Sequence, residues 1–258
     1  MKKIFLLIII FHHFFQLHAQ TNSIQNIAFQ PEEKITYKIF YSVIGMYVNA
    51  GSATFTMSNT KLGDADVYHA VGEGATNPKY DWIFKVRDRY ETYLSVSDLH
   101  PVKFIRNVNE GKYSRYEEIT FNRQTNTAVT KNGVYKVPVN VQDVISTMYY
   151  TRNIDYTQYK PGDKIAFNMF LGDKIYNLYI HYIGKEVIKT RYGKFNTIKL
   201  KPLVIKEGVF TDGEKMTVWI SDDNNHIPVR IESPVSVGSI KIDLVQYENL
   251  KYTLTALY

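Results

Sequence analysis

The sequence predicts an all-β fold, mainly antiparallel, in which twisted sheets form a sandwich or a half-barrel with one short helix near the middle of the chain. Three observations predict it. The 258 residues include 21 Tyr and 14 Phe, and aromatic residues favour strands. Apolar residues recur at a spacing of two in many short runs. Turn signals return about every eight to twelve residues, as in sandwiches and barrels, and no strand–helix–strand alternation is present.

The N-terminal residues 1–19 have the features of a secretory signal peptide. Lys2 and Lys3 supply the positive start, the run 4–15 is apolar, and Ala19 provides the small residue that a signal peptidase needs. An uncleaved membrane anchor is the alternative, but the apolar run is shorter than the roughly 20 residues that span a bilayer. Signal cleavage predicts an exported protein without a membrane span. The periplasm is the expected compartment, and the extracellular space is the alternative.

Composition excludes several classes of function. The chain has no Cys, which rules out disulfides, thiol catalysis, Cys-ligated zinc and acylation of a lipoprotein cysteine. The formal charge of +6 falls to +4 when Lys2 and Lys3 leave with the signal. Because this mild excess contains no block of like charges, no nucleic-acid partner is expected.

After a mobile leader over 20–30, we expect a single β-rich domain over 31–258. The clearest alternation in the N-terminal half is Ile35, Tyr37, Ile39, Tyr41 and Val43. The expected strands before the helix cover 35–43, 48–57, 67–72, a meander over 82–121, 127–131 and 134–139. The meander turns at 97–101 and 109–112, where Pro, Gly and Asn provide the turn chemistry.

One helix is predicted at about 141–152. Asn140 is the N-cap candidate, and Asp143 stands three residues later, as in a variant capping box. A stripe at the helical period indicates one buried face: Val144, Ile145, Met148, Tyr149 and Arg152. The helix is expected to lie across the mouth or face of the sheet. Strands follow again at 165–171, 175–183, 186–190, 195–204, 216–220, 227–232, 237–246 and 248–254, with a hairpin signal at 210–214.

Several of these stretches together carry a resemblance. They are Asp81 to Tyr93, Glu110 to Tyr113, Asp143 to Ser146, Tyr149 to Asn153, Val218 to Asp223, Ile227 to Val229 and Val237 to Ile240. Over about Pro31 to Leu250 the chain resembles the domain-of-unknown-function family 3108 of exported bacterial proteins. The resemblance implies a β-rich exported domain. It implies no catalytic residue, because no activity is assigned to the family.

No catalytic or metal-binding motif is present. The four histidines after the signal, His69, His100, His181 and His226, form no HxH or HExxH pattern, and no GxSxG nucleophile elbow occurs. We therefore predict no catalytic residue, no metal and no cofactor. A pair of carboxylates from different strands of the meander is the one enzymatic arrangement that spacing leaves open.

The meander is dense in opposite charges. Arginines beside carboxylates lower the carboxylate pKa, whereas a general acid needs a raised one. We therefore assign a set of side chains to structural ion pairs: Arg87, Asp88, Arg89, Glu91, Arg115 and Glu117.

These observations favour an exported cell-envelope protein whose role is non-catalytic binding of an amphipathic ligand or an envelope partner. A lipid, another amphipathic small molecule or an envelope protein is the expected partner. The predicted ligand-binding residues are Tyr37, Ile39, Phe55, Trp82, Phe84 and Trp219. The same residues could instead fill a closed core that the helix plugs. Two further alternatives are a carbohydrate-acting enzyme using paired carboxylates, and a structural or assembly factor recognised at exposed sheet edges.

Overall fold

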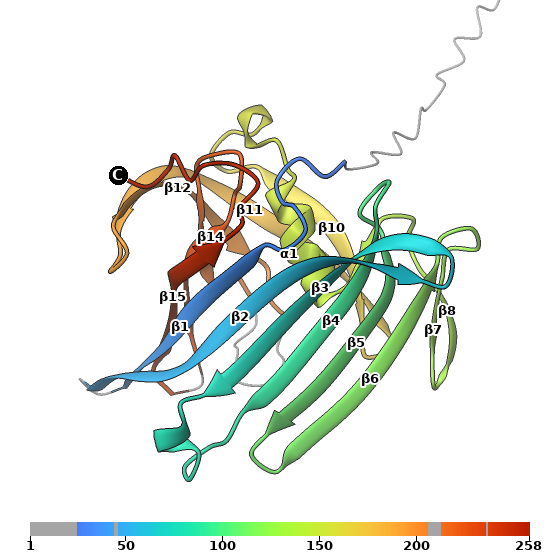
Figure 1. Cartoon of the computed structure of the whole chain (residues 1–258), viewed down its shortest axis with the longest axis horizontal. Coiled ribbons are helices and arrows are strands. Elements are labelled where there is room, and N and C mark those ends of the chain that lie inside the picture. Colours follow the sequence, from blue (N-terminus) through green and yellow to red (C-terminus); the bar gives the residue numbers. More distant parts are fainter. Residues whose placement is uncertain (1–24, 44–45, 206–212, 236) are drawn as a thin grey trace, which may run out of the picture.

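The computed structural model describes residues 25–43, 46–205, 213–235 and 237–258. The predicted signal peptide at 1–19 lies outside these ranges. In the described ranges the chain forms one 15-stranded sheet in the order β8-β7-β6-β5-β4-β3-β2-β1-β15-β14-β13-β12-β11-β10-β9. All neighbours are antiparallel except β9 and β10. The sheet curves around a single α-helix, α1 (Figure 1). The predicted all-β fold is confirmed, and of its two forms the half-barrel is the one observed.

The strands are β1 (Lys34–Val43), β2 (Met46–Leu62), β3 (Ala65–Thr76), β4 (Arg87–Ser95), β5 (Pro101–Glu110), β6 (Tyr113–Asn122), β7 (Thr127–Thr130), β8 (Gly133–Lys136), β9 (Val141–Gln142), β10 (Lys164–Leu171), β11 (Lys174–Lys189), β12 (Lys194–Pro202), β13 (Thr217–Ser221), β14 (Pro228–Pro234) and β15 (Ser239–Glu248). The helices are α1 (Val144–Arg152) and two short 3-10 helices, η1 (Pro78–Tyr80) and η2 (Tyr156–Gln158).

Alternation along the strands separates an inner face from an outer face. Ala70, Leu94, Phe104 and Ile119 stand on four successive strands, and each is fully buried on the inner face. Their sequence neighbours point outward and are polar or aromatic: His69, Tyr93, Lys103 and Glu118. At these positions of the meander, the apolar side chains therefore lie on the inner face and the polar or aromatic side chains on the outer face.

The helix is shorter than predicted and has a different cap. It begins at Val144 rather than at 141, because residues 141–142 form β9. Asp143, not Asn140, is the N-cap. Its carboxylate accepts the N–H groups of Ile145 (2.8 Å) and Ser146 (2.7 Å), and the Ser146 hydroxyl accepts the Asp143 N–H. This reciprocal capping box satisfies donors that the first turn of a helix leaves free.

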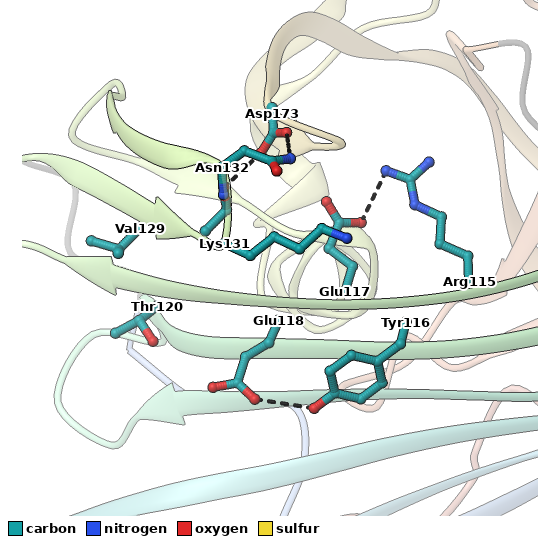
Figure 2. Close-up of a pocket in the computed structure, with 10 residues that line it drawn as sticks. Arg115, Tyr116, Glu117, Glu118, Thr120, Val129, Lys131, Asn132 and Asp173 are labelled. Carbon is teal, nitrogen blue, oxygen red and sulfur yellow. Dashed lines mark hydrogen bonds and ion pairs between the residues drawn. The ribbon is translucent and has the colours of Figure 1, made fainter.

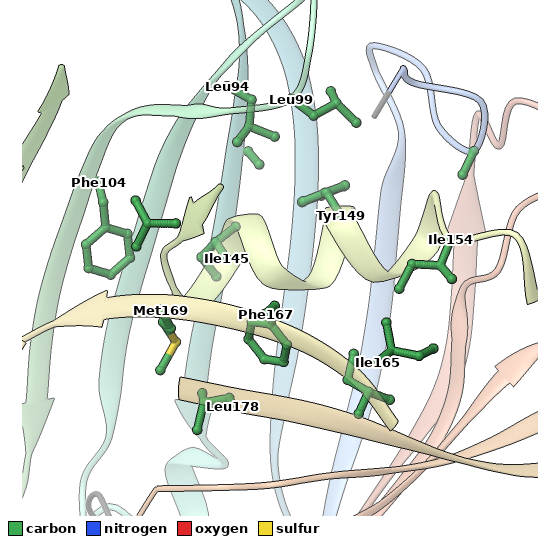
Figure 3. Packing of buried hydrophobic residues seen from close by; sticks show 14 of the residues in the cluster. Leu94, Leu99, Phe104, Ile145, Tyr149, Ile154, Ile165, Phe167, Met169 and Leu178 are labelled. Atoms are coloured by element: carbon green, nitrogen blue, oxygen red, sulfur yellow. The ribbon is translucent and has the colours of Figure 1, made fainter. Parts of the chain in front are cut away.

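The helix fills one end of the half-barrel. Its buried residues Ile145 and Tyr149 pack between inner-face side chains of β4 and β5 and those of β10 and β11 (Figure 3). Leu94 and Phe104 belong to one wall of this core, and Phe167, Met169 and Leu178 to the other. We call this helix-filled region the plugged end.

The residues just before β1 belong to the same core. Ala28 and Phe29 are fully buried, and the Phe29 ring meets Tyr149 edge-on at 4.9 Å. The Asn153 side-chain oxygen accepts the N–H groups of Ile27 and Ala28. The prediction of a mobile leader over 20–30 is therefore wrong for its last residues, which pack against the helix.

Arg152, in the last turn of α1, joins three segments of the plugged end. Its guanidinium forms a two-point ion pair with Glu33 at 2.5 and 2.8 Å, and both side chains are 1% exposed. Its remaining N–H groups reach the Ala28 and Asn225 carbonyls. Each of the three guanidinium nitrogens donates at least one hydrogen bond, so a buried charge is held at low cost.

Three other expectations differ in detail. The expected strands 175–183 and 186–190 are one strand, β11, because a bulge at Gly184 (φ +135°) absorbs the break. The meander does not start at Trp82: residues 77–86 form a loop with η1, and β4 begins at Arg87. Residues 249–254 are irregular rather than extended. The hairpin signal at 210–214 lies partly outside the described residues.

Candidate functional site

The two ends of the sheet meet at a seam. On one side stands β6 with the β7–β8 hairpin, and on the other the tight turn Gly172–Asp173 between β10 and β11. The Gly172 N–H donates to the Glu117 carboxylate at 2.9 Å, and Asp173 accepts hydrogen bonds from Thr130 (2.8 Å) and Asn132 (2.5 Å). Side chains, and not a ladder of backbone hydrogen bonds, thus close the curved sheet here.

A pocket of about 520 Å³ lies in this seam (Figure 2). We call it the seam pocket. Its lining comes from β6, from the β7–β8 hairpin and from the β10–β11 turn: Arg115, Tyr116, Glu117, Glu118, Thr120, Val129, Thr130, Lys131, Asn132 and Asp173. Most of the lining residues are polar, and both signs of charge are present.

Glu117 is the buried centre of the seam. Its carboxylate pairs with the Arg106 guanidinium at 2.6 Å, and both side chains are less than 10% exposed. Arg115 lies 3.6 Å from the same carboxylate and is 38% exposed. Glu117 therefore ties the inner face of β5 and β6 to the β10–β11 turn, while Arg115 remains in reach of solvent and of a bound group.

The other carboxylates of the seam pocket are also engaged. Glu118 pairs with Lys103 at 2.8 Å and accepts the Tyr116 hydroxyl at 3.1 Å, and the Lys103 hydrogen bond holds the pKa of Glu118 below its usual value. Hydrogen bonds from Asn132 and Thr130 lower the pKa of Asp173 in the same way. These acids stay ionised at neutral pH, and other residues of the protein already pair with them or donate hydrogen bonds to them.

The strand that lines the pocket has an open edge. Residues 113–120 of β6 pair with β5 on one side. Within the described residues, β7 pairs with β6 only through Thr120, Phe121 and Asn122. The backbone of 113–119 therefore offers alternate N–H and C=O groups to whatever lies beside the seam pocket.

The comparisons with known proteins agree with this architecture. The sequence family described as a protein of unknown function (DUF3108) matches residues 36–245. This chain belongs to the DUF3108 family. The resemblance found in the sequence is confirmed. No curated protein matches the chain at a significant level.

A solved structure similar to this DUF3108 protein shares its fold. A β-barrel-like protein of the domain of unknown function DUF1849 from Brucella abortus is 9% identical, with a TM-score of 0.56 over 88% of this chain and 100% of that chain. Two others have lower TM-scores. A candidate exported protein with a YmcC-like fold from Bacteroides fragilis is 12% identical (TM-score 0.34; 86% of this chain, 98% of that chain). A candidate lipoprotein from Parabacteroides distasonis is 14% identical (TM-score 0.38; 87% and 100%).

The six predicted ligand-binding aromatic and apolar residues do not converge. Tyr37 and Phe55 are neighbours on β1 and β2, with ring centroids 5.9 Å apart, but Tyr37 is buried and donates its hydroxyl to the Pro228 carbonyl at 3.0 Å. Ile39, also on β1, is half-buried. Tyr37 and Phe55 of the DUF3108 chain therefore pack in the core and do not line the seam pocket.

The remaining three predicted residues lie elsewhere. Trp219 is 8% exposed on β13, where its indole N–H donates to Glu186 and Lys199 lies over its ring. Trp82 and Phe84 are exposed in the 77–86 loop between β3 and β4. A single pocket lined by all six is therefore not formed.

The predicted ion-pair residues make a mixed set of contacts. Arg89 pairs with Glu91 at 2.8 Å within β4, and Arg115 reaches Glu117 as described above. Arg87 pairs outside the predicted set, with Asp81 at 2.6 Å. Asp88 accepts the backbone N–H of Asn109 at 2.9 Å.

One pair of carboxylates does converge. Asp88 and Glu110 are in hydrogen-bonding contact, and burial raises the pKa of Asp88 above its usual value. A raised pKa is what a general acid needs. Glycosidases, however, hold their two carboxyl groups about 5 to 9.5 Å apart so that the sugar and water fit between them. Two carboxyls in direct contact leave no such space.

The described part of the DUF3108 chain holds no group of three His, Asp or Glu side chains placed to bind a metal ion. Nor does any helix in that part combine the length and the apolar character that crossing a bilayer requires.

Sequence reasoning missed the partners that complete the seam pocket. Lys131 and Asn132 were recognisable as a hairpin turn, and Gly172 and Asp173 as a tight turn, each from local signals. Nothing in the sequence indicates that these two turns, about forty residues apart, hydrogen-bond to each other, because the closure of the sheet brings them together.

Proposed function

We propose that this protein is an exported, non-catalytic component of the cell envelope that binds an extended segment of an envelope protein along the open edge of β6. One observation carries the proposal: among the described residues, the edge of β6 that faces away from β5 has no strand partner over 113–119, where it borders a pocket of about 520 Å³. An added strand would satisfy the free backbone groups of that edge.

The seam pocket supplies the side-chain contacts that strand addition uses for specificity. Successive side chains of an added strand point alternately to the two faces of the sheet. One set would meet Arg115 and Lys131, the cations of the pocket that reach solvent. The other would pass Tyr116, which is 59% exposed on the outer face. A partner segment with acidic side chains on one face fits this arrangement.

The geometry favours this role over a carrier of an amphipathic ligand. The predicted aromatic set does not converge, and the space beside α1 is filled by core side chains such as Phe167 and Leu178. Export rests on the predicted signal peptide at 1–19.

The test is site-specific photo-crosslinking in cells that export the protein. A photo-reactive residue replaces Tyr116 or, as a matched control, Val187, which is 55% exposed near the far end of β11. We expect a protein adduct that forms from position 116 and not from position 187. In the isolated complex, hydrogen exchange of the 113–119 amides is expected to slow, because an added strand occupies their hydrogen bonds. Equal adducts from both positions, or unchanged exchange along β6, would refute strand addition.

A further inference from the structure

Three consecutive large apolar side chains stand in solvent on the loop between β3 and β4. Trp82 is 83% exposed, Ile83 62% and Phe84 45%. Single exposed apolar residues are ordinary in soluble proteins, whereas a contiguous cluster of this kind marks an interaction surface. We call residues 77–86 the apolar loop.

The apolar loop is a built structure that presents these side chains. Asp81 accepts the Thr76 hydroxyl at 2.7 Å and pairs with the Arg87 guanidinium at 3.1 and 2.6 Å. The N–H groups of Ile83 and Phe84 both donate to the Tyr80 carbonyl. The polar side chains thus fasten the base of the loop and leave the apolar ones outside.

The neighbouring turn supports the same loop. The N–H of Gly111, in the β5–β6 turn, donates to the Lys85 carbonyl at 2.7 Å, and Val86 bridges to Glu110. A Cβ atom on Gly111 would lie 2.9 Å from the Phe84 ring, so the ring rests directly on this turn. Tyr113, the first residue of β6, follows the same turn and is 51% exposed.

The start of β2, on the same edge of the half-barrel, exposes apolar side chains as well. The start of β2, the β3–β4 loop and the β5–β6 turn follow one another along the lower left edge of Figure 1. Met46 and Tyr47, at the start of β2, are 61% and 47% exposed. The apolar loop is therefore the most prominent part of a longer apolar edge.

Exposed lysines flank the apolar loop. Lys79, Lys85 and Lys112 are exposed, and none of them takes part in an ion pair among the described residues. Asp81 is neutralised by Arg87. Trp82 and Phe84 are thus flanked by lysines that make no ion pair in the described part of the chain. Side chains of this kind partition into the interface of an anionic membrane, with the rings at headgroup depth and the ammonium groups near the phosphates.

We propose that the apolar loop docks this protein on the surface of a bilayer that contains anionic lipid. The attachment is peripheral: Trp82, Ile83 and Phe84 enter the interfacial layer, and the three lysines contact lipid phosphates. The inference goes beyond the binding of a partner at β6 and does not depend on it.

The test is co-sedimentation with vesicles of phosphatidylethanolamine and phosphatidylglycerol, against vesicles of phosphatidylcholine. All proteins are purified from cells that export them, so that any processing of the N-terminus is shared. Replacing Trp82, Ile83 and Phe84 together by Ser is expected to lower the partition coefficient on anionic vesicles by at least about tenfold. Replacing Lys79, Lys85 and Lys112 by Gln is expected to lower it about fivefold per lysine, and to leave binding to phosphatidylcholine unchanged.

The matched control is Val134→Ser with Val139→Ser, which removes exposed apolar side chains (67% and 43%) from β8 and from the turn that follows it. This variant is expected to bind vesicles as the parent does. Trp82 also gives a direct signal, because the other tryptophan of the chain, Trp219, is buried. Brominated lipid should quench the fluorescence of the parent and should not quench that of Trp82→Phe.

Three outcomes would overturn the proposal. The loop variant could bind anionic vesicles as tightly as the parent. The parent could bind neutral and anionic vesicles equally, with no effect of the lysine replacements. The parent could leave vesicles unbound and form a dimer that the loop replacements abolish, which would make a second copy of this chain the occupant of the loop. Unchanged thermal unfolding of the variants shows that they are folded.

Discussion

Two glycines on the inner face of β3 stand in opposite surroundings. A Cβ atom on Gly72 would lie 2.8 Å from the Phe55 ring and 3.2 Å from Ile145 of the helix, whereas a Cβ on Gly74, two residues along the same strand, would have no atom within 4 Å. Both glycines lie inside β3, so their local secondary structure is the same. The plugged end and the opposite edge of the half-barrel thus differ because of what lies over the strand, and not because of the strand itself.

Ion pairs show the same contrast. Arg152 and Glu33 at the plugged end are 1% exposed and form a two-point ion pair, whereas Arg87 and Asp81 beside the apolar loop are 39% and 26% exposed. A buried charge depends on its partner, because the interior offers no water to replace it. A solvated charge can lose its partner with little effect. The plugged end should therefore carry most of the stability, and the opposite edge should tolerate change.

Among the variants that test this contrast, Arg152→Met is expected to change stability most. It leaves the Glu33 carboxylate buried without a cation, and we expect the free energy of unfolding to fall by about 3–5 kcal/mol. Urea denaturation measures it. Arg87→Met is the control at the other edge and should change stability far less. Adding Glu33→Gln to Arg152→Met should recover part of the loss, and similar effects of the two arginine replacements would contradict the contrast.

The pH dependence of stability tests the helix cap at the plugged end. Burial raises the pKa of Asp143 to about 6, against 3.8 in the unfolded chain, although hydrogen bonds from Ser146, Thr92 and Ile145 oppose the shift. A raised folded pKa means that the native state binds this proton more tightly. The stabilisation from protonated Asp143 is complete below about pH 4 and is lost as pH rises through about 6, with a total of about 3 kcal/mol.

The variant Asp143→Asn isolates this contribution. Its amide oxygen can still cap the helix, and it does not titrate. The difference in unfolding free energy between the parent and the variant should therefore change between pH 4 and pH 6 and be flat above. Lowered pKa values of His100 (to about 4) and His226 act with the opposite sign, but they are common to both proteins and cancel in the difference. A pH-independent difference would show that Asp143 is not protonated in this range.

The smallest effect is expected from the glycine pair itself. Gly72→Ala forces the Phe55 ring or the helix to move, at a cost of about 1–3 kcal/mol. Gly74→Ala meets open space and should leave the unfolding free energy within about 0.5 kcal/mol of the parent. Thermal or urea unfolding of both variants provides the measurement. Equal losses at the two positions would mean that β-strand propensity, and not packing by the helix, sets the cost.

Local patterns were sufficient where a local interaction decides the structure. The alternation of Ile35 and Tyr37 predicted β1, and the turn at 109–112 needed no more than its own Asn and Gly residues. The start of the helix was misplaced because both Asn140 and Asp143 are acceptable caps. Ser146 decides between them, since its hydroxyl completes the reciprocal bond with Asp143.

Contacts between distant segments were beyond local patterns. Arg152 was recognised as part of the buried helix stripe, but its partner Glu33 stands in a segment adjoining one expected to be mobile. Trp82 and Phe84 were expected to line a ligand pocket on a concave sheet, and the structure places them in solvent.

By itself, the sequence determined an antiparallel β protein with one central helix, because strand alternation and turn chemistry are properties of neighbouring residues. Its resemblance to the DUF3108 family was also visible in the sequence. The tertiary structure alone decided which end of the strands is filled, which charges are buried and which strand edge borders a pocket. These depend on how fifteen strands curve until Glu117 meets Gly172, a closure that links residues far apart in the chain and leaves no periodic signal along it.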